Sequence, residues 1–532
     1  MFKFLILFSA LFIHTIHAEV FVQRIILQGS EKSTSKQKNS IVFAELSVPG
    51  GNQKLETQLQ PYLGQPINKE TLLAIKKEIV SYYASVDHPL VLIRVPEQSV
   101  KDGTVRVIVT EARAGEITYV GNCRFSDRTL ERYLHLKPGQ PIDQDLLLND
   151  IASMNRSPFH NTNASLIPGT AQGLTDIELV TKDRFPLRTY AGADNTGNQF
   201  SENVRLYAGF NYGNMFWIGD LLTYQFTMAP SYKDFSSHFA SYTSFLPWGH
   251  TMVVYGALAW IEPDIQTFRS TGKSSQLSFR YQMPFKPYYK PFFQELRFGF
   301  DYKGTNSDLF FIDNLLDAPL ITHQVNLTQI TLGYQSNNNT PKNQWTITGD
   351  LFFSPGPWLA NQKDSDFNDL RAHAKNIYAY GRFSFGDIVS LPRGFSFASL
   401  LRMQAATGPL LPSEQYGLGG YNTVRGYDER QFNADNAINL GVEIRSPSLN
   451  IKQKLCDELI FLAFVDYGFG TNYQNELPEV PSSENLLSTG LGARYLIQPY
   501  VSARADYGFK LLHPALSGGS LGKFHLSITA GY

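Results

Sequence analysis

Residues 295–302 read ELRFGFDY and residues 276–283 read QLSFRYQM. In both stretches apolar or aromatic side chains alternate with polar or small ones. Successive side chains of a β-strand point to opposite faces of the sheet. The period of two therefore predicts strands with one apolar face and one polar face. Such strands build either the wall of a membrane-spanning barrel around a wet lumen or a soluble β-sandwich.

The same alternation continues to the end of the chain. From Leu187 onward we identify sixteen segments of period two, bounded by Gly, Pro and Asn. An even number of strands is typical of closed bacterial barrels. The segments start near residues 187, 203, 220, 237, 251, 275, 295, 324, 343, 376, 395, 435, 459, 486, 500 and 523.

The lengths of the connections separate the two architectures. If the first strand rises from the periplasm, every second connection is periplasmic and should be short. Among these connections, the turns at residues 247–250 and 497–499 are short and the one near Pro284 is moderate. Residues 446–457 are the longest exception to the expected short length. The opposite set is long throughout, and this alternation favours the barrel. Its long members are residues 303–323, 353–374, 407–433 and 469–485.

The composition agrees with a barrel and excludes several classes of protein. Aromatic residues make up 13% and charged residues only 17% of the chain, whereas soluble domains carry about 25% charge. No stretch reaches the ~18 consecutive apolar residues of a membrane helix. The net charge of −1 gives no reason to expect a nucleic-acid partner. Two cysteines, Cys123 and Cys456, do not form a disulfide framework.

The N-terminus predicts export from the cytoplasm. Lys3 precedes an apolar run over residues 4–13, and Ala18 offers a small residue at a cleavage site. We therefore expect a signal peptide at residues 1–18, since the run is too short to span a bilayer. A retained membrane anchor is the alternative. Residues 19–40 follow as an N-terminal segment with a strand and a polar linker.

A tandem repeat with a period of 75 residues precedes the barrel. The motif GQPIN at residues 64–68 recurs as GQPID at residues 139–143. Each copy reads as a short helix, a turn containing Gly, and a second helix capped by Asn68 or Asp143. Strand pairs follow both helical hairpins. In the first copy, the strand before the helices is either residues 41–48, or residues 21–29 with the linker as an insertion.

The repeat resembles the polypeptide-transport-associated (POTRA) domain. The second copy carries VGN at residues 120–122, LKPGQP at 136–141 and GLTD at 173–176, and the first carries VPEQ at 95–98 and EAR at 111–113. The resemblance implies tandem α/β POTRA domains followed by a 16-stranded antiparallel transmembrane β-barrel. The expected limits are residues 41–113 for POTRA 1, 114–183 for POTRA 2 and 184–532 for the barrel.

A four-residue motif falls in the sixth long connection, at residues 407–433. It reads Val424, Arg425, Gly426, Tyr427 and resembles the VRGY signature of the BamA-like superfamily of translocators and insertases. The resemblance implies that this loop folds back into the lumen and that Arg425 pairs with Asp466 on the thirteenth strand. By strand parity, Phe464 and Asp466 face inward, and Gly468 follows them on the same strand. The same parity turns Glu443 on the twelfth strand inward. Alternatively, Arg425 is a solvated loop charge and Asp466 is one lumen charge among many.

Together these motifs resemble a two-partner secretion translocator of the haemolysin and filamentous-haemagglutinin exporter type. The resemblance implies an outer-membrane protein whose periplasmic POTRA domains capture a large unfolded secreted polypeptide, which then crosses the pore. No catalysis, cofactor or metal is expected. Other partners would be outer-membrane lipids and, because residues 524–532 alternate and end in an aromatic residue, the barrel-assembly machinery.

Other functions remain as alternatives. An insertase for outer-membrane proteins belongs to the same superfamily but usually carries more POTRA domains. A surface lipase would need a Gly-x-Ser-x-Gly or His-Glu-x-x-His motif, and we find neither. A passive porin has no use for POTRA domains. Some family members have an N-terminal plug helix, whereas residues 19–40 read as a strand and a linker. Whether the resting pore is plugged is therefore left open at this point. We expect Cys123 and Cys456 to be unpaired.

Overall fold

The computed structural model describes residues 19–30, 39–171, 173–198, 201–262, 264–265, 268–285, 288–313, 316–452, 456–473, 481–514 and 520–532. The expected signal peptide and most of the polar linker lie outside these residues. The chain divides into two compact units. One extends to Val120 and includes Leu134–Asp150 and Asn163–Val180; the other comprises Gly121–Tyr133, Ile151–Thr162 and Thr181–Tyr532.

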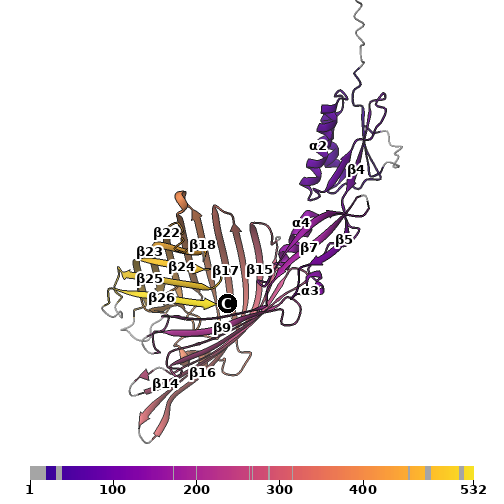
Figure 1. Ribbon diagram of the computed structural model, residues 1–532. Coiled ribbons are helices and arrows are strands. Elements are labelled where there is room, and N and C mark those ends of the chain that lie inside the picture. Colours follow the sequence, from indigo (N-terminus) through magenta and orange to yellow (C-terminus); the bar gives the residue numbers. More distant parts are fainter. Residues whose placement is uncertain are drawn as a thin grey trace, which may run out of the picture. The chain divides into compact units, whose positions relative to one another are not determined.

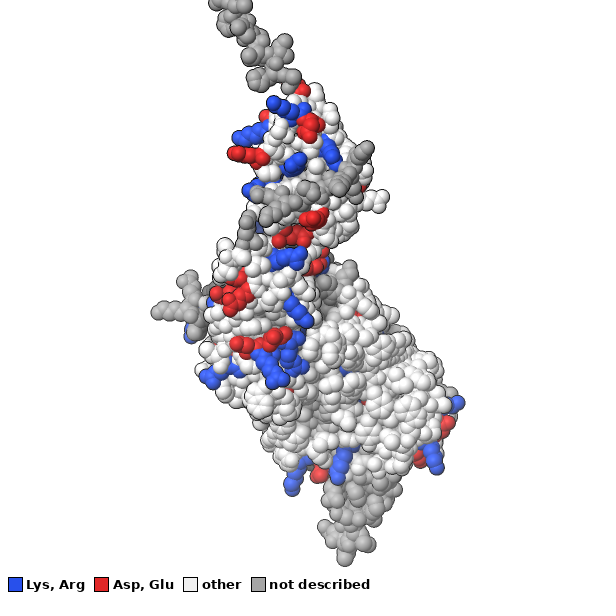
Figure 2. All heavy atoms as spheres, turned by 90° about the vertical axis from the view of Figure 1, so that its right-hand side faces the viewer, with Lys and Arg blue, Asp and Glu red and all other residues white. Residues whose placement is uncertain are grey.

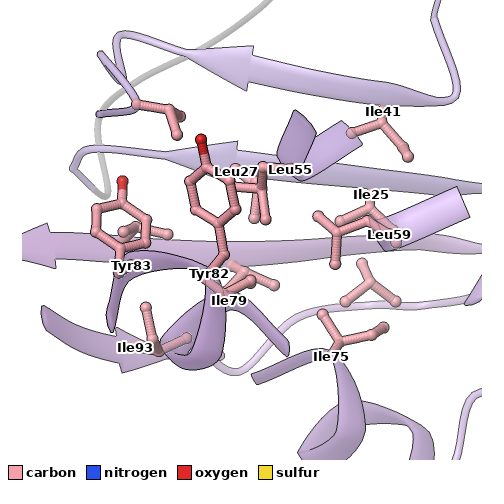
Figure 3. Close-up of a cluster of buried hydrophobic side chains, with 14 of the residues drawn as sticks. Ile25, Leu27, Ile41, Leu55, Leu59, Ile75, Ile79, Tyr82, Tyr83 and Ile93 are labelled. Carbon is pink, nitrogen blue, oxygen red and sulfur yellow. The ribbon is translucent and has the colours of Figure 1, made fainter. Parts of the chain in front are cut away.

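The first repeat is a four-stranded sheet covered by two helices. Its elements are β1 (Arg24–Gln28), β2 (Ile41–Ala44), α1 (Asn52–Leu59), the 3-10 turn η1 (Gln60–Tyr62), α2 (Lys69–Ser85), β3 (Val91–Arg94) and β4 (Thr104–Glu111). Helix α2 begins where the side chain of Asn68 accepts a hydrogen bond from the Thr71 N–H at 2.8 Å, as its sequence predicts. Aliphatic side chains of the sheet pack against Leu55, Leu59, Ile75 and Ile79 of the helices (Figure 3).

The strand order settles the alternative that the sequence left open. The sheet runs β2-β1-β4-β3, so β1 lies between β2 and β4 and pairs with β4 in parallel. In the second repeat β5 (Arg113–Val120) holds the same position beside β7 (Leu174–Asp183). The expected domain start is residue 41, and the structure shows that Ile25 and Leu27 of β1 are also fully buried in the core of this sheet. Strand β2 is the additional edge strand.

The second repeat has three strands in the order β5-β7-β6. Its elements are β5 (Arg113–Val120), α3 (Asp127–Glu131), α4 (Gln144–Met154), β6 (His160–Pro168) and β7 (Leu174–Asp183). Asp143 accepts a hydrogen bond from the Leu146 N–H at 2.9 Å, so it caps α4 as Asn68 caps α2. The turn glycines Gly64 and Gly139 both adopt positive φ, at 80° and 84°. The two copies thus share local conformation as well as sequence.

Sixteen long strands close into an antiparallel barrel, as the sequence predicts (Figure 1). Every predicted segment contains a strand, and the largest offset of a start is eight residues, 324 predicted against 316 observed. The strands are β8 (Leu187–Asp194), β9 (Arg205–Gly213), β10 (Leu221–Met228), β11 (Phe235–Phe245), β12 (Thr251–Ile261), β14 (Phe268–Pro284), β15 (Phe292–Asp313), β16 (Leu316–Asn339), β17 (Asn343–Pro355), β18 (Ile377–Ser390), β19 (Ser396–Ala406), β22 (Asn436–Arg445), β23 (Asp457–Thr471), β24 (Ser483–Ile497), β25 (Val501–Lys510) and β26 (Gly522–Gly531). The short β13 (Asp264–Ile265) pairs with β14, and β26 closes the barrel on β8.

The two alternating stretches that suggested a barrel lie side by side as β14 and β15. Phe279 stands opposite Phe300 on the outer face, and Ser278 opposite Asp301 on the inner face. Asp301 is 1% exposed and bonds Arg280 inside the barrel at 2.9 Å, whereas Phe279 and Phe300 are each 38% exposed. On the side that Figure 2 shows, most of the barrel wall carries no charge. Apolar side chains therefore face outward and charged pairs inward.

One predicted loop is wrong. Residues 303–323 were expected to form a long surface loop, but β15 continues to Asp313 and β16 begins at Leu316. Ladder pairs from Lys303↔Leu327 to Asp313↔Leu316 join the two strands across this region. Cross-strand hydrogen bonds extend the sheet beyond the apolar band of the barrel. The alternation of side chains alone does not show where a strand ends.

Three further findings complete the fold. The remaining elements are α5 (Asp364–Leu370), the 3-10 turn η2 (Pro392–Gly394), β20 (Tyr416–Leu418) and β21 (Phe432–Ala434). Within the described ranges no helix is both long and apolar enough to cross a bilayer. Cys123 and Cys456 are unpaired, as predicted, and both are exposed.

Candidate functional site

Residues 407–435, here called loop 6, fold into the barrel instead of extending from it. Strands β20 and β21 make the loop a hairpin. Its apolar residues pack against the inward faces of β22 to β24. The cluster consists of Leu418, Val424, Tyr427, Phe432, Ala434, Ala437 and Leu486. Because this cluster excludes water, the loop has a fixed position in the lumen.

Arg425, at the tip of loop 6, binds Asp466 through a two-pronged contact. Its Nε and Nη2 donate to the two carboxylate oxygens of Asp466 at 2.7 and 2.8 Å, and its backbone N–H donates to the same carboxylate at 3.1 Å. The two side chains are only 6% and 2% exposed. Parallel hydrogen bonds between a guanidinium and a carboxylate fix orientation as well as distance.

Two other expected residues complete the Arg425 contact. Nη1 donates to Glu443 on β22 at 2.7 Å, and Glu443 also accepts a hydrogen bond from Arg445 at 2.9 Å. The guanidinium lies 3.5 Å from the ring centre of Phe464. Phe464 on β23 therefore supplies a cation–π contact on the face of the guanidinium. The structure brings Arg425, Asp466, Glu443 and Phe464 together.

The remaining motif residues hold the loop around Arg425. Val424 is fully buried, and a Cβ at Gly468 would lie 2.8 Å from it, so only glycine leaves room there. The Gly426 N–H donates to Nε2 of His525 at 2.9 Å. The Tyr427 hydroxyl lies within hydrogen-bond distance of the carbonyls of Leu487 and Leu512, at 2.8 and 2.7 Å. All eight expected site residues thus lie in one region.

Several residues of this site were not identified from the sequence. Asp506 on β25 lies 3.8 Å from Arg425 and is bound by Arg494 and Arg504, each at 2.7 Å. Arg504 also donates to the carbonyl of Tyr421 in loop 6 at 2.8 Å. Alternation on β24 and β25 would have placed these side chains inward. It could not show that they meet Arg425.

A second contact secures the same loop nearer its start. Glu414 is fully buried and accepts hydrogen bonds from Lys303 at 2.8 Å, Gln329 at 2.9 Å and the Tyr380 hydroxyl at 2.6 Å. These partners come from β15, β16 and β18. Loop 6 is therefore attached to two parts of the barrel wall: to β15, β16 and β18 through Glu414, and to β22 and β23 through Arg425. Breaking one partner of such a buried ion pair typically costs about 3–5 kcal/mol.

A cavity of about 650 Å³ lies beside the Arg425 contact. Arginines 402, 425, 445, 494 and 504 line it together with the carboxylates of Asp387, Glu443 and Asp466. With Asp506, which binds Arg494 and Arg504, four carboxylates offset most of the charge of these five arginines. Among the described residues no group of three or more His, Cys, Asp or Glu could hold a metal ion. The site is built to hold a loop in a polar channel.

Known proteins share both parts of this chain. Residues 173–495 match the family described as haemolysin secretion/activation protein ShlB/FhaC/HecB, and residues 37–112 match the ShlB-type POTRA domain. The heme/hemopexin transporter protein HuxB of Haemophilus influenzae (strain 86-028NP) is 23% identical over 460 residues, covering 82% of this chain and 77% of that protein.

Solved structures show the same fold. CdiB from Escherichia coli superimposes with a TM-score of 0.77 at 16% identity, covering 98% of this chain and 93% of CdiB. BamA from Haemophilus ducreyi, lacking POTRA domains 1–3, gives a TM-score of 0.53 at 16% identity, covering 91% and 98%. The family match spans more than half of the sequence. The chain therefore belongs to the haemolysin secretion/activation family ShlB/FhaC/HecB, the outer-membrane translocators of two-partner secretion.

Proposed function

We propose that this translocator exports its partner polypeptide through the lumen and that the Arg425–Asp466 contact sets the resting position of loop 6 in that path. The observation that carries the proposal is the two-pronged hydrogen bond between Arg425, whose side chain is 6% exposed, and Asp466. Among the described residues, no other ion pair at the tip of loop 6 has this two-pronged geometry. The mechanism requires binding and threading of a chain, and no catalysed reaction.

The contact can control passage because loop 6 occupies space inside the barrel. A buried, hydrogen-bonded ion pair holds the loop at one depth. A polypeptide that crosses the lumen has to pass this loop or displace it. Glu443, Phe464 and Asp506 stabilise the guanidinium when it is docked. We propose that Val424, Gly426, Tyr427 and Gly468 shape the loop around this contact.

We propose that the partner is captured in an unfolded state by the POTRA domains. In the first repeat a groove of about 580 Å³ lies between α2 and the edge strand β3. Leu72, Leu73 and Ile93 line it with Lys69, Lys76 and Arg94. An extended peptide can add to a free strand edge through backbone hydrogen bonds while apolar pockets hold its side chains. We propose domain limits of residues 24–112 and 113–183 for the two POTRA domains.

The decisive experiment replaces Arg425 by alanine. We expect the variant to fold and insert, because the barrel ladder does not involve Arg425, but to export less partner and to conduct differently in planar bilayers. The partner is identified beforehand as the polypeptide that disappears from the culture medium when this translocator is deleted. Its amount in the medium then measures export.

A matched control separates loop docking from the loss of any lumen charge. Arg297 on β15 also faces the lumen, and it binds Asp350 on the neighbouring wall at 3.1 Å instead of a loop residue. Arg297→Ala should leave export near the parental level. If Arg425→Ala exports and conducts like the parent, the proposed role of the contact is wrong.

A further inference from the structure

A second surface loop is folded over loop 6. Residues 356–376, here called loop 5, connect β17 to β18 on the side of the barrel from which loop 6 also starts. This loop contains the helix α5, and Arg371 follows directly after it. The Arg371 guanidinium binds both carboxylate oxygens of Asp435, with Nη2 to Oδ2 at 2.8 Å, and it also donates to the carbonyl of Leu410.

Arg371 thereby ties together the two ends of loop 6. Leu410 lies at the start of that loop and Asp435 is its last residue before β22. The Asp435 carboxylate is fully buried and accepts another hydrogen bond from the Leu410 N–H at 3.0 Å. It also accepts one from the Tyr473 N–H at 3.1 Å, which follows β23. One ion pair thus joins loop 5, both limbs of loop 6 and the chain after β23.

An apolar contact reinforces the ion pair. Phe367 of α5 is fully buried and packs 6.2 Å, centre to centre, from the ring of Tyr378. Leu410 and Leu411 of loop 6 join the same cluster, so one aromatic side chain of loop 5 sits between loop 6 and the wall. The buried members are Val325, Leu327, Phe367, Ala374, Tyr378, Tyr380, Leu410 and Leu411.

Besides Arg371, loop 5 is held by the buried side chains of Gln362, Phe367, Ala374 and Asn376 and by hydrogen bonds to β16, such as Gln362 Nε2 to the Thr328 hydroxyl at 2.8 Å. Helix α5 has seven residues, and Phe367 is its one buried side chain. Helices of this length are not stable by themselves. Segments outside the barrel ladder can open locally at lower free energy than the ladder itself. Among the described residues, loop 5 pairs with no strand of the barrel, so it can leave its position while the barrel stays closed.

We infer that loop 5 is a latch on the surface end of loop 6, that Arg371 and Phe367 are its positioning residues, and that release of this latch is a step in opening the pore. The inference rests on the proposed role of loop 6 in export. It adds a second point of control that lies apart from Arg425. The latch holds the limbs of the loop, whereas Arg425 holds its tip.

Release of the latch is measured with a reporter cysteine. Ala374 is itself part of loop 5 and is 2% exposed in the cluster that contains Phe367. In a chain with Cys123→Ser and Cys456→Ser, Ala374→Cys therefore reacts with a membrane-impermeant maleimide only when the loop lifts. We expect Arg371→Ala to raise the labelling rate on intact cells about tenfold, the equivalent of about 1.4 kcal/mol. Arg371→Lys keeps the positive charge but loses the two-pronged hydrogen bond, so its labelling rate should lie between those of the parent and of Arg371→Ala. Open-channel events in planar bilayers should rise in the same order.

Controls keep the two proposals distinguishable. Lys375→Ala removes an exposed cation from the same loop and should change neither readout. Phe367→Ala tests the latch independently if Arg371→Ala does not fold. If folded Arg371→Ala and Phe367→Ala both label and conduct like the parent while Arg425→Ala still impairs export, the latch is wrong and the proposed function stands. If Arg425→Ala also has no effect on export or conductance, the proposed function fails as well.

Discussion

Gly426 at the tip of loop 6 and Gly508 on β25 lie backbone to backbone inside the barrel. A Cβ at Gly508 would stand 2.5 Å from the Gly426 nitrogen, and one at Gly426 would stand 2.7 Å from the Gly508 carbonyl oxygen. Gly426 also has φ of 94°, a conformation that side chains rarely adopt. The loop reaches Asp466 only because neither position carries a side chain.

Gly508→Ala should displace the loop tip, since the added methyl group meets backbone atoms that cannot rotate away. We expect loss of the Gly426–His525 hydrogen bond, altered conductance and a decrease in export comparable to that of Arg425→Ala. Gly349→Ala on β17 is the matched control, because a Cβ there meets nothing within 4 Å. Parental conductance of Gly508→Ala would show that the tip tolerates the shift.

Asp466→Asn should loosen loop 6 more than Glu443→Gln does. Asp466 accepts three hydrogen bonds from Arg425. Glu443 accepts only one hydrogen bond from Arg425, and its side chain is 15% exposed. Truncation of the buried partner of an ion pair costs about 3–5 kcal/mol, and exposed partners contribute less. Hydrogen exchange of a peptide covering residues 416–434 measures the difference. Equal protection in both variants would contradict this ranking.

Deletion of residues 24–112 should abolish export without preventing insertion of the barrel. The deletion removes the sheet β2-β1-β4-β3 as a whole, so it leaves no partial core exposed. The groove between α2 and β3 is lost with it. Export is measured in the culture medium, and insertion by the membrane fraction of the variant. Normal export by the shortened chain would remove substrate capture from this repeat.

The second repeat should lose stability in mild acid because of His160. This residue on β6 is 7% exposed, and burial lowers its pKa to about 4, with Asp183 partly offsetting the shift. Unfolded His160 binds a proton near its ordinary pKa of 6.5, and the folded form does so only near 4. The stability is therefore complete above the higher value and decreases by about 1.4 kcal/mol per pH unit between the two.

Hydrogen exchange of β6 and β7 checks the pH effect at about pH 7.5 and about pH 5, after correction for the intrinsic exchange rate. Protection should fall at the lower pH, and His160→Asn should remove most of that fall because its side chain does not titrate. Equal protection at both pH values in the parent would show that the buried imidazole does not control local stability.

The sequence alone determined the architecture of the barrel and its repeats. Alternation as at Phe298, Phe300 and Tyr302 located the sixteen barrel strands, because side-chain direction in a strand depends only on position parity. The repeat was visible because Asn68 and Asp143 cap equivalent helices. The motif around Arg425 and the parity of Asp466 led to the loop contact through a family resemblance. These are local signals, or signals shared with known families.

The tertiary structure decided everything that depends on which faces meet. The contacts of Arg425 with Asp506 and of Arg371 with Asp435 join residues far apart in the chain. Strand parity says that such side chains face the lumen, but the tilt and stagger of the strands set their depth. The path of loops 5 and 6 through that lumen comes from the burial of Phe367, Leu418 and Val424. Likewise, only pairing with β4 showed β1 to be a central strand, because an apolar stretch does not specify its neighbours in a sheet.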